Sequence, residues 1–373
     1  MNSKIAIFSF FSGSGLLDLG FEKSGFDIVF VNEHSASFIN AYAYSRKKMN
    51  MCAPEYGYHN TDINEYMGGL KKNLRAFMSD AKKNNEIVGF IGGPPCPDFS
   101  IGGKNNGRDG ESGKLSSTYV NLIISEKPDF FIFENVKGLW RTGRHRKFYQ
   151  ELTSDLHNVG YCTTEHMMNA LAFGVPQDRD RLLLFGVRKG KMTKDFYYQS
   201  EMLNFPWSLH ADYKLDHVKS ICWPKTDEFS EESQKEPDEG IVQELTVQHW
   251  FEKNDVLNHP NASAYFKPRA GLARMLSIDE GDVSKKSYKR LHRWRYSPTA
   301  AYGNNEVHLH PYKARRISVS EALAIQSLPK EFMLPDKMSL SDMFKTIGNG
   351  VPYLLSKALA STIRGYLDTA VKK

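Results

Sequence analysis

The chain has 373 residues, of which 40% are hydrophobic and 25% charged, which is typical of a globular protein with one large core or two domains. Its net charge of +6 allows a polyanionic partner without requiring one. Four dispersed cysteines disfavour a zinc ribbon and a disulfide framework, and they favour a reducing cytoplasm and no metal. The chain shows no signal-peptide pattern, and no apolar stretch approaches the ~20 residues of a membrane span, which disfavours a membrane partner.

The N-terminal segment has the organisation of a nucleotide-binding βαβ unit. The apolar run 5–11 predicts a central strand of a parallel sheet, and a tight turn at 12–15 precedes a helix over 16–24. A second strand, 26–31, ends at Asn32 and Glu33, where an acid can accept both hydroxyls of a ribose. The glycine turn lacks the full dinucleotide fingerprint, so taken alone it also fits an ordinary turn.

A cysteine between two prolines follows the next predicted strand, 87–91. Pro95 and Pro97 each fix their own φ and restrict the residue before them, so the backbone of Cys96 is nearly fixed. A nucleophile needs such a fixed presentation. Seen alone, a cysteine is more often a small buried hydrophobe.

The segment after this cysteine is rich in glycine and carries bases. Five glycines lie between residues 102 and 117, together with Lys104, Arg108 and Lys114. A mobile basic loop beside a nucleophile suits a lid that closes over phosphates, and a plain solvated loop is the alternative.

An acid ends the most apolar strand of the chain. Glu134 follows the predicted strand 130–133, so it should be partly desolvated, which raises its pKa and favours the protonated form. A helix-capping acid is the alternative. Helices over 117–126 and 147–158 and a strand over 181–187 complete this part of the chain.

The block from 190 to 297 differs from the rest of the chain, because its periodicity weakens and its charges cluster. Residues 227–240 hold seven acids and one base, whereas 285–295 hold six bases and no acid. We therefore expect a catalytic and cofactor-binding domain at 1–189, a separate irregular domain at 190–297 and a return segment at 298–373. Helices are predicted again at 318–327 and 351–367.

Six stretches of the chain resemble, in the same order, motifs of the bacterial DNA (cytosine-5) methyltransferase family. They are Phe11-Ser12-Gly13-Ser14-Gly15, Asp62-Ile63, the segment from Gly92 to Ser100, Glu134-Asn135-Val136, the segment from Gln177 to Arg181, and the segment from Gly348 to Pro352. The resemblance implies an α/β fold: a Rossmann-like S-adenosylmethionine-dependent methyltransferase domain with a mixed central sheet and a smaller irregular target-recognition domain.

The resemblance also implies the roles of individual residues. Cys96 is the nucleophile, Glu134 binds cytosine at N3 and its amino group, and Arg181 meets the cytosine O2. Arg179 orients the loop or the active site. The expected cofactor residues are Phe11, Ser12, Gly13, Ser14, Gly15, Glu33, His34, Asp62, Ile63, Pro94, Leu115, Asn349, Gly350 and Val351. The expected DNA contacts are Ser100, Lys104, Arg108, Lys289, Arg290 and Arg293, with the acidic segment 227–240 away from the DNA.

Together these features predict methyl transfer from S-adenosylmethionine to carbon 5 of a flipped-out cytosine in a specific double-stranded DNA sequence, by a monomer. The same chemistry on a structured RNA such as tRNA, and a catalytically silent DNA-binding relative, are the alternatives. A functional pairing with a restriction endonuclease is left open. Asp98 and Gly350 depart from the usual residues of their motifs, and neither removes a reacting group.

Overall fold

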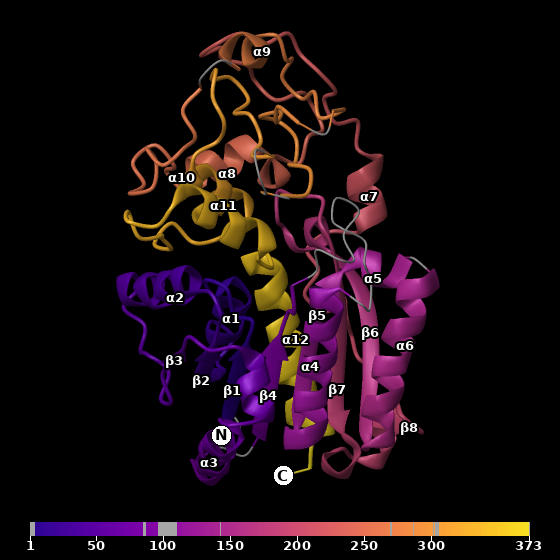
Figure 1. Ribbon diagram of the computed structural model, residues 1–373. Coiled ribbons are helices and arrows are strands. Elements are labelled where there is room, and N and C mark those ends of the chain that lie inside the picture. Colours follow the sequence, from indigo (N-terminus) through magenta and orange to yellow (C-terminus); the bar gives the residue numbers. More distant parts are fainter. Residues whose placement is uncertain are drawn as a thin grey trace.

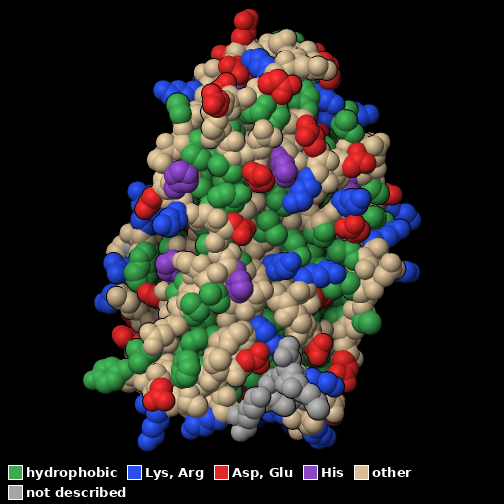
Figure 2. Space-filling view, turned by 180° about the vertical axis from the view of Figure 1, so that it is seen from behind, with side chains coloured by type: hydrophobic (Ala, Val, Ile, Leu, Met, Phe, Trp, Pro, Cys, Tyr) green, Lys and Arg blue, Asp and Glu red, His purple; other side chains and the backbone are tan. Residues whose placement is uncertain are grey.

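The computed structural model describes residues 4–84, 87–95, 110–141, 143–268, 271–285, 287–300, 302 and 306–372. It consists of a sheet covered by helices and, above it, a second part with short helices and long loops (Figure 1). The opposite face of the molecule carries interspersed acidic and basic side chains (Figure 2). None of the helices in the described ranges is long and apolar enough to cross a membrane.

The sheet has nine strands in the order β3-β2-β1-β4-β5-β7-β6-β9-β8. Strands β1 to β5 are parallel neighbours, whereas β7 runs antiparallel to both β5 and β6, which makes the sheet mixed as expected. The strands are β1 (Ile5–Phe10), β2 (Asp27–Asn32), β3 (Tyr58–His59), β4 (Ile87–Gly92), β5 (Phe130–Val136), β6 (Tyr161–Asn169), β7 (Asp180–Arg188), β8 (Tyr197–Tyr198) and β9 (Glu201–Met202).

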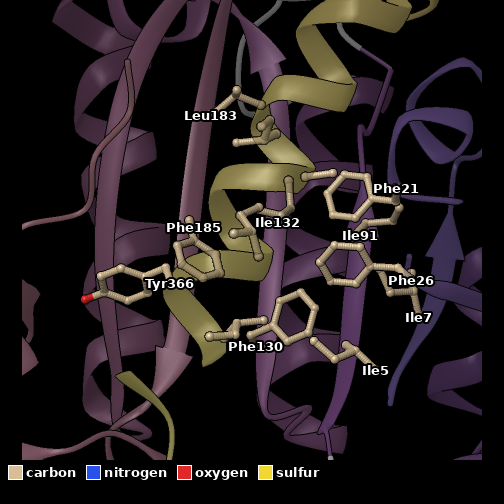
Figure 3. Close-up of a cluster of buried hydrophobic side chains, with 14 of the residues drawn as sticks. Ile5, Ile7, Phe21, Phe26, Ile91, Phe130, Ile132, Leu183, Phe185 and Tyr366 are labelled. Carbon is tan, nitrogen blue, oxygen red and sulfur yellow. The ribbon is translucent and has the colours of Figure 1, made fainter. Parts of the chain in front are cut away.

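Helices cover both faces of this sheet, which explains why its central strands are continuously apolar. On one face, side chains such as Ile7, Ile132 and Phe185 pack against α1 (Leu16–Glu22) and α12 (Tyr353–Ala370) (Figure 3). Alternate side chains such as Phe10 and Phe133 point to the other face. That face is covered by α3 (Lys71–Asn84), α4 (Glu111–Glu126) and α6 (Gly143–Asn158). The sheet is flanked by α2 (Ala36–Lys48) and α5 (Lys137–Arg141).

Another apolar core holds the second part of the molecule together and connects it to α1 and α2 through Leu16, Leu19 and Ala41. It joins α8 (Val247–Lys253) to α10 (Val319–Ile325) and α11 (Leu340–Asn349), while α7 (Leu215–Ser220) and α9 (Leu272–Leu276) pack in smaller clusters. We call residues 208–349 the recognition part, after the target-recognition domain that the resemblance implies.

Both expected domain boundaries differ from this arrangement. The chain still belongs to the sheet after residue 190, because β9 pairs with β6 and because Met202 and Phe205 lie in the core beneath α12. The segment after 297 does not return to the sheet at once, since α10 and α11 build the core of the recognition part. After residue 297, the element that packs against the sheet and completes the sheet domain is α12.

Candidate active site

The register of β5 and β7 brings an acid and a base together. Val136 lies opposite Arg181 in this antiparallel pair, so Glu134, two residues earlier, points to the same face as the arginine. The Arg181 Nε lies 2.7 Å from the Glu134 Oε1, and both side chains are more than nine-tenths buried. An ion pair excluded from water in this way holds the carboxyl group in one place.

The Gly-Pro-Pro segment that leads to Cys96 lies against this carboxyl group. Strand β4 is the parallel neighbour of β5, and Gly93 follows its last residue. A Cβ on Gly93 would lie 2.5 Å from the Glu134 Oε2, so any larger residue here would have to displace this carboxyl group. Pro94 is buried. Cys96 itself lies outside the described residues.

The environment of Glu134 changes its acidity in the expected direction. Burial raises the pKa of Glu134 above its ordinary value, and the nearby Arg181 and Arg179 oppose this effect without cancelling it. A raised pKa means that the carboxyl group retains a proton more readily. The prediction made from the apolar strand is therefore confirmed, and such a group can protonate or hydrogen-bond a ring nitrogen.

Arg179 is fully buried and joins three segments of the chain. Its guanidinium donates to the Ala300 carbonyl oxygen at 2.9 Å and to the carbonyl oxygens of Gly348 and Gly350 at 2.6 and 2.9 Å. Gln177 accepts a weaker bond from it and donates to Gln326. Arg179 therefore ties β7 to the turn after α11, which agrees with the orienting role and not with a direct contact to the base.

The glycine turn after β1 and the acid after β2 form one continuous structure. The two carboxylate oxygens of Glu33 accept backbone N–H groups from Gly13 at 2.9 Å and from Ser35 at 2.8 Å. Each oxygen keeps a second lone pair, so the half-buried carboxylate can still accept hydroxyl groups. Gly13 and Gly15 have φ values of +56° and +79°, which favour glycine. This arrangement fits the ribose of a nucleoside cofactor.

The other expected cofactor residues at the N-terminal side lie around this turn. The Phe11 ring packs edge-on against Tyr119 of α4, and Leu115 lies four residues before Tyr119 on the same helix. Asp62 caps the short helix η1 (Ile63–Met67), which α4 contacts through a hydrogen bond from Thr118 to Asn64. His34 is exposed and Ile63 is buried.

The C-terminal motif reaches the same turn from the far end of the chain. The Thr346 hydroxyl donates to the Ser14 hydroxyl oxygen at 2.9 Å. Gly350 lies so close to Leu16 that a Cβ on it would lie 2.3 Å from that side chain. Asn349 is exposed and Val351 is buried. The structure thus brings together the segments that carry the expected cofactor residues, although they span most of the sequence.

A buried charged cluster supports the glycine turn from below, and sequence reasoning missed it. The Arg46 guanidinium donates to the Gly15 carbonyl oxygen at 2.6 Å and pairs with Glu22 at 2.8 Å. Burial raises the pKa of the neighbouring Asp18 to about 7, against the opposing effects of the Ser9 hydroxyl and of Arg46. Asp18 and Arg46 lie on helix faces that are otherwise largely apolar. A charged residue at such a position was the only sequence signal that could have predicted this buried cluster.

The expected DNA contacts are placed differently. Ser100, Lys104 and Arg108 lie outside the described residues, and Lys114 is exposed on α4, which begins at Glu111, within the segment expected to be a loop. Lys289 is half-buried. Arg290 and Arg293 are 0% and 3% exposed. A phosphate contact requires an exposed base, so we correct the expectation for these two arginines.

Their partners explain why Arg290 and Arg293 are buried. Arg290 donates to four backbone carbonyl oxygens, those of Met275, Ile278, His310 and Lys313. Arg293 pairs with Glu280 at 2.8 Å and donates to Ser233 in the acidic segment. The acidic segment 227–240 and the basic segment 285–295 therefore lie against each other, so the basic segment expected near the DNA has the acidic segment beside it.

The fold and this site define a class of protein. A mixed sheet with helices on both faces, a glycine turn joined to an acid that suits a ribose but lacks a pyrophosphate fingerprint, and a buried acid beside the Gly-Pro-Pro segment are features of a methyltransferase that takes its methyl group from S-adenosylmethionine.

Comparisons with known proteins identify the family. The model of the C-5 cytosine-specific DNA methylase family matches residues 5–365. The type II methyltransferase M.NmeDI of Neisseria meningitidis serogroup C is 56% identical over 366 residues, which cover 98% of this chain and 84% of that protein. M.MthTI of Methanothermobacter thermautotrophicus is 30% identical over 381 residues, which cover 99% of both. The chain belongs to the C-5 cytosine-specific DNA methylase family and is a DNA cytosine methyltransferase.

Solved structures agree in fold. A putative DNA modification methyltransferase encoded within an E. coli prophage superposes with a TM-score of 0.64 at 20% identity, covering 98% of this chain and 100% of that one. The S. pombe Dnmt2 methyltransferase gives a TM-score of 0.58 at 14% identity, with 98% of both chains covered. The α/β fold with a mixed sheet, expected from the motifs, is confirmed.

Proposed function

We propose that this enzyme methylates carbon 5 of a cytosine flipped out of a specific duplex sequence, through a covalent adduct between Cys96 and carbon 6. The observation that carries the proposal is the buried Glu134–Arg181 pair with Gly93 pressed against it, at the end of the strand that leads into Cys96. A base stacked in a duplex cannot reach so enclosed a group, so the target must leave the stack.

The chemistry assigns a task to each group. The Cys96 thiolate adds to carbon 6, a C–S bond forms, and the electron pair of the 5,6 double bond moves to carbon 5 while Glu134 holds a proton at N3. Bound S-adenosylmethionine would supply an electrophilic methyl group, and the broken sulfur–methyl bond leaves the neutral thioether S-adenosylhomocysteine. Carbon 5 takes that group, a base such as water removes the carbon-5 proton, and the double bond re-forms as the sulfur leaves. Arg181 keeps Glu134 in place and is the candidate for the cytosine O2, and Arg179 ties β7 to the turn after α11.

The adduct can be trapped on a duplex that carries 5-fluorocytosine at the target, because fluorine at carbon 5 cannot leave as a proton does. With cofactor present, the wild-type protein should form a complex that survives denaturing electrophoresis, and Cys96→Ser should form none. Cys52→Ser and Cys222→Ser, which change exposed cysteines, are the controls and should trap normally. Equal trapping by Cys96→Ser would overturn the assignment.

The substrate is tested separately from the adduct. Bisulfite sequencing of DNA from cells that express the protein should show methylation at one recurring sequence. Methyl transfer to tRNA but not to duplex DNA in the purified system would replace DNA with RNA as the substrate. Action as a monomer in the cytoplasm and a functional pairing with a restriction endonuclease are parts of the same proposal. The type II methyltransferases among its relatives support the pairing.

A further inference from the structure

A group of exposed bases follows the catalytic strand directly. Residues 137–147 contain five bases and no acid, and we call these five side chains the basic ridge: Lys137, Arg141, Arg144, Arg146 and Lys147. All five are exposed. Helix α5 begins at the residue after β5 ends, three positions beyond Glu134, and α6 continues the ridge. The ridge therefore begins directly after the strand that carries Glu134.

The two helices fix the direction in which the ridge points. Leu139, Phe148 and Tyr149 are buried against the sheet, so the bases between them are left on the outer side. The Arg146 guanidinium lies 4.2 Å from the centre of the Trp140 ring, which joins α6 to α5. A base held over an aromatic ring loses less freedom when it meets an anion, so this part of the ridge is ordered in advance.

The first residue of the ridge joins it to the second catalytic strand. The Lys137 Nζ lies 2.6 Å from the Asp180 Oδ2, and Asp180 immediately precedes Arg181. In Figure 1, α5 lies at the upper end of the sheet domain, below α7 of the recognition part. The ridge therefore borders the same side of the sheet domain as the Glu134–Arg181 pair.

These features match a nucleic-acid backbone. Lys and Arg side chains that meet phosphates displace condensed counterions, which is the main source of affinity for DNA. Arg144 and Lys147 are three residues apart on one face of α6, about 5–6 Å between their Cβ atoms, so they can follow one strand. Both lie in the first turns of α6, where the helix dipole also favours an anion.

We propose that the basic ridge binds the sugar–phosphate backbone of the DNA beside the target cytosine. The inference rests on the proposed function, because it takes duplex DNA as the substrate. It assigns to the sheet domain the electrostatic contacts that were expected from Arg290 and Arg293, which are buried.

The test replaces Arg141, Arg144, Arg146 and Lys147 together with Gln in the full chain. The control replaces four exposed bases at the other end of the strands, away from Glu134: Lys82, Lys83, Lys127 and Lys189. Their replacement with Gln changes the net charge by the same amount. Binding to a fluorescein-labelled duplex of random sequence is followed by anisotropy over a range of salt concentrations. The ridge variant should bind at least about tenfold more weakly at 0.1 M salt, with a salt slope shallower by about 0.9 for each phosphate that the ridge no longer neutralises.

Further measurements separate this inference from the proposed function. Both variants should keep wild-type cofactor affinity by calorimetry, and the ridge variant should still methylate DNA at low salt and high DNA concentration. Wild-type affinity and slope in the ridge variant, or an equal weakening in the control, would overturn the inference. Wild-type protein that neither binds nor methylates duplex DNA would overturn the proposed function. A loss of tRNA binding alone in the ridge variant would reject DNA as the partner of the ridge.

Discussion

The sheet domain and the recognition part use charged side chains in opposite ways. In the sheet domain, polar groups lie at the carboxyl ends of apolar strands, where a ligand can reach them: Glu33 directly follows β2, and Glu134 lies near the carboxyl end of β5. In the recognition part, Arg290 and Arg293 point inward. That part has short helices and long loops, so many backbone carbonyl oxygens lack ladder partners, and arginine supplies donors for several at once. Charge clustering in the sequence therefore indicates a binding surface only where regular structure satisfies the backbone.

The largest expected effect tests the sheet side of this comparison. Glu134→Gln cannot supply a proton to N3, so the single-turnover rate of methyl transfer should fall by about 10²- to 10⁴-fold. Cofactor affinity by calorimetry should stay near the wild-type value. Glu126→Gln, which changes a buried and Arg-paired glutamate far from the site, is the control and should keep the rate. A loss of cofactor binding at an unchanged rate would move Glu134 to the cofactor site.

The next effect tests the recognition part. Arg293→Met leaves Glu280 buried without its partner, which should lower the free energy of unfolding of this part by about 3–5 kcal/mol. The measurement is urea unfolding followed by the fluorescence of tryptophans, including Trp294. Lys285→Gln changes an exposed base of the same segment and should alter stability by no more than about 0.5 kcal/mol. If Arg293→Met leaves stability intact but flattens the salt dependence of DNA binding, Arg293 contacts phosphate after all.

A third prediction concerns Asp18, which is buried in the sheet domain yet does not line the site. Its pKa of about 7 in the folded state lies above the ordinary value near 4, so the folded protein keeps a proton that the unfolded chain releases. Stability should therefore fall as the pH rises from about 4 to about 7 and stay low above that range.

Asp18→Asn removes this titration, because the amide is neutral at every pH. The variant should be more stable than the wild type at pH 8 by about 2–4 kcal/mol, and the difference should shrink towards pH 4. Urea unfolding at both pH values measures it, with the exposed Asp27→Asn as the control. A constant difference across this pH range would mean that Asp18 is ionised in the folded protein.

The smallest effect concerns the cofactor. Glu33→Ala removes the acceptor that the Gly13 and Ser35 N–H groups hold in place, and the affinity for S-adenosylmethionine should fall by roughly 1–3 kcal/mol, the usual loss for hydrogen bonds to a charged group. Glu55→Ala, an exposed change beyond the pocket, should have no effect in the same calorimetric titration. An unchanged affinity in Glu33→Ala would exclude Glu33 from the pocket.

Local patterns in the sequence were enough to predict the central strands of the sheet and the place of the proposed catalytic acid. The apolar runs at 5–11, 87–91 and 130–133 correspond to β1, β4 and β5. A strand buried on both faces is apolar at every position, so the run itself identifies it. The raised pKa of Glu134 followed from its position at the end of such a run. The motif order alone placed the chain in its family, as the comparisons confirm. Helices α2, α3 and α11 and strand β6 were not predicted.

The burial of individual charges was decided by tertiary structure. Arg293 is paired by Glu280 and by Ser233, which is 60 residues away in the chain, and Arg179 bonds carbonyl groups up to 171 residues away. A local sequence pattern cannot show partners that are so distant in the chain. A lysine or arginine that becomes buried therefore looks the same in the sequence as one that contacts DNA. The path of α11 from the recognition part to the glycine turn likewise depends on packing between segments distant in the chain. The sequence therefore determined the chemistry of the site, and the tertiary structure determined which charges remain available to a partner.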